Sequence, residues 1–160
     1  MAKETIHRGK KKFVADVLWT IQLKNRTLAV TQTPLLTPFD SQMYRSGLCA
    51  LLERRWYDAH EDLEHVWRQC TGDDRLFLQA LIQGAVCLEH RHRDNQRESW
   101  GQLRKAREKA NRIPSFFMGI HLDEWLAALH ELDPQSPKEK WPTPQLEPAL
   151  ERWIFEKTAD

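Results

Sequence analysis

Residues 56–67 read WYDAHEDLEHVW and have the spacing of an amphipathic helix. One face of that helix carries three apolar and two polar side chains, namely Trp56, Leu63 and Trp67 with His60 and Glu64. A carboxylate on a face that packs against a core needs a hydrogen-bond donor or a cation. The sequence therefore predicts that Glu64 pairs with His60, four residues before it, while Glu61 lies at the edge of the same face.

A longer helix is predicted from about residue 74 to residue 92, where Asp94 and Asn95 end it. It has a polar row beside its apolar one, formed by Gln79, Gln83, Val86 and His90. In an antiparallel pair of helices, this row could face His60 and Glu64. The two rows would then form a buried polar site between the helices.

Two interpretations of this site remain open. In the functional one, His60, Glu61, Glu64, Gln83 and His90 line a pocket for a ligand, a metal or a reaction. In the structural one, which the sequence favours, they form a hydrogen-bond network that fixes how the helices dock. The structural interpretation predicts that His60→Ala costs on the order of 2 to 4 kcal/mol of stability.

The rest of the chain has the same helical character. Further helices are predicted at about residues 40–54, with Asp40 or Ser41 as cap, at 96–112, at 122–133 and from Pro148 onward. No segment shows convincing strand alternation, so the predicted fold is all-α, a compact bundle of about five to seven helices.

Three regions are expected along the chain. Residues 1–38 form a basic N-terminal extension with a short helix at about 12–24, residues 39–133 the helical core, and residues 134–160 a proline-rich connector with a C-terminal helix.

Length and composition place the chain among single-domain soluble proteins. It has 160 residues, of which 29% are charged, and a mean hydropathy of -0.67. No apolar run is long enough to span a membrane, and none fits a secretory signal. Three cysteines without a CxxC pair indicate reduced thiols. A cytoplasmic protein is therefore expected.

Charge is unevenly distributed along the chain. Residues 91–112 carry eight Lys and Arg against three acidic residues, and residues 113–160 carry four against nine. The basic helix, with Arg104, Lys105, Arg107 and Lys109, could bind RNA or an acidic protein. Nucleic acid is the disfavoured partner, because aromatic residues are not interleaved with the basic ones and no known nucleic-acid module is present. The sequence also leaves open whether the chain forms a homo-oligomer.

Arginines near the predicted site are a separate case. Arg68, Arg91 and Arg93 could hold an anion at its mouth, but a solvated arginine is the commoner outcome.

A metal site is the enzymatic alternative. The run HEDLE at residues 60–64 is close to the HExxH zinc motif, but a glutamate replaces the second histidine. His60, Glu64 and His90 could still bind a divalent metal such as zinc, with Glu61 as the general base of a hydrolase. The sequence favours no metal and no cofactor, because His and Glu four residues apart are common on ordinary helices.

These motifs together carry a resemblance. The run YDAHEDLEHVW at 57–67, the run FLQALIQGA at 77–85, and the later His90 and Asn95 are similar to the helical domain-of-unknown-function family 309 over about residues 40–112. The resemblance implies an all-helical fold without an assigned activity. The signature positions it implies are His60, Glu61, Glu64, Trp67, Gln83, His90 and Asn95.

This chain departs from the family pattern in one place. The pattern usually has Gly before the Asn and Gly-Ala shortly after it. Here Asp94 precedes Asn95, and Ser99-Trp100 occupy the positions of the Gly-Ala pair. Because these residues are larger, the helix that follows Asn95 is expected to pack less closely than in the family pattern.

Overall fold

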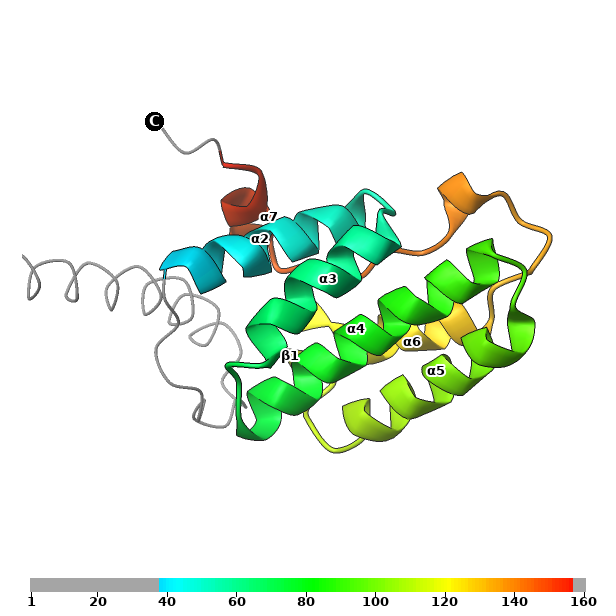
Figure 1. The fold of residues 1–160 in the computed structure, drawn as a ribbon, viewed down its shortest axis with the longest axis horizontal. Helices are drawn as coiled ribbons and strands as arrows, with labels where there is room; N and C mark the ends of the chain where they lie inside the picture. The colour runs from blue at the N-terminus through cyan, green and yellow to red at the C-terminus, as the bar shows by residue number, and fades with distance from the viewer. Residues whose placement is uncertain (1–37, 157–160) are drawn as a thin grey trace, which may run out of the picture.

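The computed structural model describes residues 38–156, and it is helical as predicted (Figure 1). The predicted short helix at 12–24 lies outside the described residues. In chain order the elements are α2 (Pro38–Leu52), α3 (Trp56–Trp67), α4 (Gly72–His92), α5 (Gln96–Ala110), β1 (Phe116–Phe117), β2 (Ile120–His121), α6 (Leu122–His130), the 3-10 turn η1 (Lys138–Lys140) and α7 (Pro148–Phe155). No helix within 38–156 is both long enough and apolar enough to cross a membrane.

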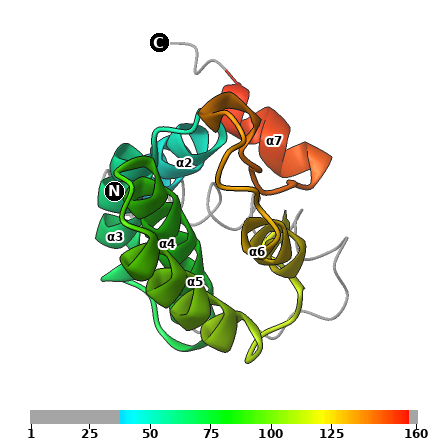
Figure 2. The ribbon, with the colours of Figure 1, turned by 90° about the vertical axis from the view of Figure 1, so that its right-hand side faces the viewer.

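Helix α4 lies at the centre of the bundle because it is apolar on nearly every side. It packs against α3, α5 and α6, which surround it (Figure 2). Leu81 and Ala85 are fully buried, and Gly84 lets α6 approach, with the ring of Trp125 against the glycine. A β-carbon on Gly84 would lie 2.5 Å from this ring.

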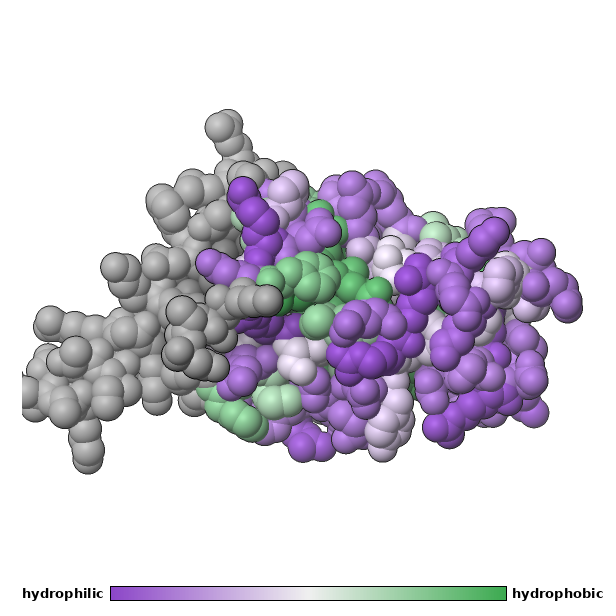
Figure 3. Space-filling model, turned by 90° about the horizontal axis from the view of Figure 1, so that it is seen from above, coloured by the Kyte–Doolittle hydropathy of each residue, from purple (hydrophilic) through white to green (hydrophobic). Residues whose placement is uncertain are grey.

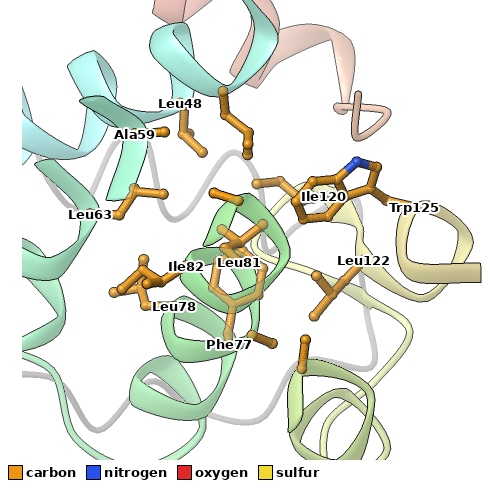
Figure 4. Packing of buried hydrophobic residues seen from close by; sticks show 14 of the residues in the cluster. Leu48, Ala59, Leu63, Phe77, Leu78, Leu81, Ile82, Ile120, Leu122 and Trp125 are labelled. Atoms are coloured by element: carbon orange, nitrogen blue, oxygen red, sulfur yellow. The ribbon is translucent and has the colours of Figure 1, made fainter. Parts of the chain in front are cut away.

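Helices α2 and α3 form a pair, and α3 packs on one side of α4. Gly47 of α2 meets the side chain of Leu63 of α3, and the absence of a side chain at Gly47 makes this contact possible. Leu63 is fully buried and lies in the same core as residues from α2, α4 and α6 (Figure 4). The predicted face of residues 56–67 is therefore only partly correct: Trp56 and Leu63 are buried, but Ala59 and Val66 complete the buried face in place of His60 and Glu64.

Close packing of α5 onto α4 is retained despite the departure from the family pattern. Four residues of α5 are buried, and three of them are small: Ser99, Leu103, Ala106 and Ala110. The hydroxyl of Ser99 lies 3.2 Å from the thiol of Cys87 on α4. Ser99 therefore takes the place of a smaller residue without separating the helices.

The turn between α4 and α5 explains why glycine would be favoured before Asn95. Asp94 has φ 59°, in the left-handed region, which Asp tolerates better than most residues but Gly adopts freely. Asn95 is the N-cap of α5, and its side chain accepts a hydrogen bond from the backbone N–H of Glu98 at 3.3 Å.

One detail of the prediction was wrong, and one small feature was not predicted. Asp40 and Ser41 do not cap α2, because the helix already includes Pro38 and both residues are inside it. A small antiparallel hairpin also exists, with Phe117 opposite Ile120 across Met118 and Gly119. Both turn residues have positive φ, as a two-residue hairpin turn requires. Strands of two residues are too short to show an alternating pattern, so no sequence pattern indicates them.

The proline-rich segment after α6 belongs to the same core. Trp141 stacks on Trp56 of α3 with ring centroids 5.3 Å apart, and Leu146 pairs with Ile120 of the hairpin. Leu150 and Ile154 of α7 are buried, and α7 packs against α2. The face seen from above is mostly hydrophilic, with an apolar area near the middle of the view (Figure 3).

Candidate functional site

The predicted His60–Glu64 pair is present on α3. Nε2 of His60 lies 2.8 Å from Oε2 of Glu64, and Oε1 of Glu64 accepts a hydrogen bond from Nη2 of Arg68 at 3.1 Å. The side chains of His60 and Glu64 remain about a third exposed, at 31% and 34%. The three residues form a row along the surface of one helix, rather than a buried network.

The other predicted site residues are directed elsewhere. Oε1 of Gln83 accepts a hydrogen bond from Nζ of Lys109 on α5 at 2.9 Å, so this side chain faces α5 and not α3. His90 is partly buried, and no hydrogen bond joins it to His60 or Glu64 within residues 38–156.

Glu61, Trp67 and Asn95 also have separate places. Glu61 is exposed. Trp67 is covered by the guanidinium of Arg75, which lies 3.9 Å from its ring centroid, and Asn95 caps α5. The structure therefore brings His60 and Glu64 together, and it places Gln83 against α5, Trp67 beside Arg75 and Asn95 at the cap of α5.

The ligand set of the metal alternative is not assembled here. In the described part of the chain, no three His, Cys, Asp or Glu side chains are grouped so that they could hold a metal ion. His60 and Glu64 supply one imidazole and one carboxylate, but the carboxylate is already bound by Arg68.

We expect His60→Ala to change the free energy of unfolding by no more than about 0.5 kcal/mol, because a solvated pair four residues apart on one helix contributes little. Urea unfolding followed by circular dichroism measures this change. Leu63→Ala, at the fully buried neighbour, is the control and should cost about 3 kcal/mol. If His60→Ala lowers the free energy of unfolding by about 2 kcal/mol or more, the structural interpretation of the pair would be supported instead.

A second candidate site lies along the exposed side of α5. An open groove of about 760 Å³ is lined by α5, by Asn111 just after it, and by His130, the last residue of α6. We call it the α5–α6 groove. Four cationic side chains line it: Arg97, Arg104, Lys105 and Arg107. All four are exposed.

The groove also has an apolar part. Trp100 is 40% exposed although it is among the largest side chains of the described region. The ring of His130 meets it edge-on, with centroids 5.5 Å apart. Beside it is Gly101, where an added β-carbon would have no atom within 4 Å. An aromatic wall next to an empty position on a basic helix is an arrangement that can receive a partner.

The charges around the groove are mixed. Glu98 and Glu108 also line it. Beyond it, burial raises the pKa of Asp123 on α6, and the guanidinium of Arg107 opposes this shift. Burial lowers the pKa of Lys109, which is turned toward Gln83 and away from the groove. The cations of the groove therefore do not form an uninterrupted positive stripe.

Arg91 was expected to be solvated, and this expectation was wrong. Arg91 is only 3% exposed, and its guanidinium lies over the ring of Trp100, 5.1 Å from the centroid. Arg68 and Arg93 behave as expected, exposed and paired with Glu64 and Glu89.

Sequence reasoning found part of this site. The basic helix with Arg104, Lys105 and Arg107 was identified as a candidate for binding anions. Trp100 and Gly101 were missed, although a tryptophan followed by a glycine inside a charged helix is an unusual pattern that could have marked them.

Comparison with known proteins gives a family match over part of the chain and no activity. Residues 44–101 match the family model described as Domain of unknown function (DUF309). This range includes α3, α4 and the first part of α5. No curated protein and no solved structure matches the chain.

Proposed function

We propose that this chain, whose residues 44–101 match the DUF309 family model, is an interaction module that binds an acidic macromolecule in its α5–α6 groove. The observation that carries the proposal is the groove itself, which is lined by four exposed cations, a partly exposed tryptophan and a glycine with free space around it. Interfaces typically combine aromatic and arginine side chains in this way.

The site on α3 supports a function less well. His60, Glu64 and Arg68 satisfy one another at the surface, so none of them is held ready for a substrate. In contrast, Arg97, Arg104 and Arg107 make no ion pair to any carboxylate within residues 38–156. Cations that are unpaired and gathered on one face attract an anionic partner and speed its association.

The proposal predicts that Arg104→Glu weakens binding of an acidic probe by about tenfold or more, because the change reverses a charge inside the groove. Two labelled probes are suitable, a peptide of alternating glutamate and alanine and a short oligouridylate, with binding followed by fluorescence anisotropy. Affinity should fall as salt rises from about 50 to 200 mM.

The matched control is Arg152→Glu. It makes the same chemical change at an exposed position of α7, a helix that does not line the groove. Equal effects of the two variants would mean that the probes sense only net charge. That result, or no binding of either probe, would contradict the proposed function.

A further inference from the structure

We infer that the partner is an acidic polypeptide segment and that one of its carboxylates pairs with the buried guanidinium of Arg91. The inference rests on the proposed function, because the Trp100 side chain that covers Arg91 also lines the α5–α6 groove. It adds the class of the partner and the residue that anchors it.

The starting observation is the state of Arg91. The side chain is buried on α4, and its Nε, Nη1 and Nη2 atoms have no hydrogen-bond partner among the described residues. A guanidinium carries five N–H donors and stays charged, so burying it unpaired is strongly unfavourable. Buried charges in proteins are normally paired, so an unpaired one marks a position where a bound group can supply the missing acceptor.

The neighbours of Arg91 do not supply the missing acceptor. The Cys87 thiol and the Ser99 hydroxyl, both buried, are 3.2 Å apart and interact with each other. Trp100 offers only its ring, which covers the guanidinium. Trp100 lies over the guanidinium, lines the groove and is 40% exposed, so the inference requires that a partner in the groove displaces this side chain to reach Arg91.

The chemistry of the site fits a carboxylate. The planar fork of a guanidinium matches the two oxygens of a carboxylate, and a single buried positive charge balances a single negative one. The indole of Trp100 provides an apolar wall, which suits a polypeptide that presents both acidic and apolar side chains.

Nucleic acid fits the groove less well. Glu98 and Glu108 interrupt the row of cations and would repel a continuous phosphate backbone. Trp100 is the one aromatic side chain of α5, whereas single-stranded nucleic acid is usually held by several stacked aromatic rings.

Gly101 is the second independent observation. Glycine weakens a helix compared with alanine, and here no neighbour within 4 Å requires its small size. A polypeptide that packs closely on α5 at this point would need a residue without a side chain here. The open position lies next to Trp100, at the place where the partner would approach Arg91.

The test uses the full chain, the glutamate–alanine peptide, its glutamine–alanine counterpart and the oligouridylate. The glutamate peptide should bind more tightly than the other two probes. Arg91→Met should weaken this binding by about tenfold or more, and Gly101→Ala should weaken it as well. Thermal melting should show that the peptide stabilises the wild-type chain and not Arg91→Met.

The free protein provides a second measurement. Without peptide, Arg91→Met should melt at the same temperature as the wild type or higher, because an apolar side chain replaces an unpaired buried charge. A clearly lower melting temperature would show that the guanidinium is paired within the fold and would contradict the inference.

The remaining outcomes separate the inference from the proposed function. Binding that depends on Arg104 but is unchanged in Arg91→Met, or tighter binding of the oligouridylate, would overturn the inference and leave the proposed function standing. If Arg104→Glu weakens binding of both probes no more than Arg152→Glu does, the inference and the proposed function are both overturned.

Discussion

Gly84→Ala is expected to destabilise the protein by about 2 to 3 kcal/mol, although alanine is the better helix former. The added β-carbon would lie 2.5 Å and 2.6 Å from two carbons of the Trp125 ring. This ring cannot move away easily, because it is buried and its Nε1 donates a hydrogen bond to the carbonyl of Pro142 at 3.0 Å. The clash can be relieved only if α6 moves away from α4. Urea unfolding measures the resulting loss of stability.

Gly101→Ala is the matched control. It is the same substitution in a neighbouring helix, at a position with free space around it. It should increase stability by about 0.5 to 1 kcal/mol, through helix propensity alone. If Gly84→Ala were as stable as the wild type, the close approach of α6 to α4 would be wrong.

Trp141→Ala is expected to cost about 3 to 4 kcal/mol, as large truncations in a core do. Trp141 is 5% exposed and stacks on Trp56, and its Nε1 donates to the carbonyl of Ser136 at 3.0 Å. Its own carbonyl accepts a hydrogen bond from Nε of Arg54 at 3.0 Å. The substitution therefore tests whether the proline-rich segment is part of the core.

The control for this prediction is Trp100→Ala, which removes a side chain of the same kind from a half-exposed position. It should cost at most about 1 kcal/mol. A change of similar size in both variants would mean that the segment around Trp141 covers the core only loosely.

The fold could be predicted from the sequence because its helices are regular and strongly patterned. In α3 the buried residues Trp56, Ala59, Leu63 and Val66 follow the spacing of one helical face. In α4 the helical spacing of Leu78, Leu81, Ile82, Ala85 and Leu88 identified the helix, but the side expected to face α3 was wrong at Gln83. A helix surrounded by others has no single buried face, so pattern alone does not assign its partners.

The site could be predicted only in part for the same reason. The spacing of four residues brought His60 and Glu64 together, since this contact depends on one helix alone. The direction of Gln83 depends on how α4 docks, and the structure turns it toward Lys109. The burial of Arg91 depends on Trp100 of α5, and no local pattern in the sequence could reveal this contact.

The most direct test of the central claim is a nuclear magnetic resonance titration of the labelled chain with the glutamate–alanine peptide. The account predicts that the amide shifts which change most belong to residues 97–111 of the α5–α6 groove, to His130 and to Arg91, while those of residues 60–68 stay in place. If the largest shift changes belong to residues 60–68 instead, the account is contradicted, and the His60–Glu64 face of α3 is the binding site.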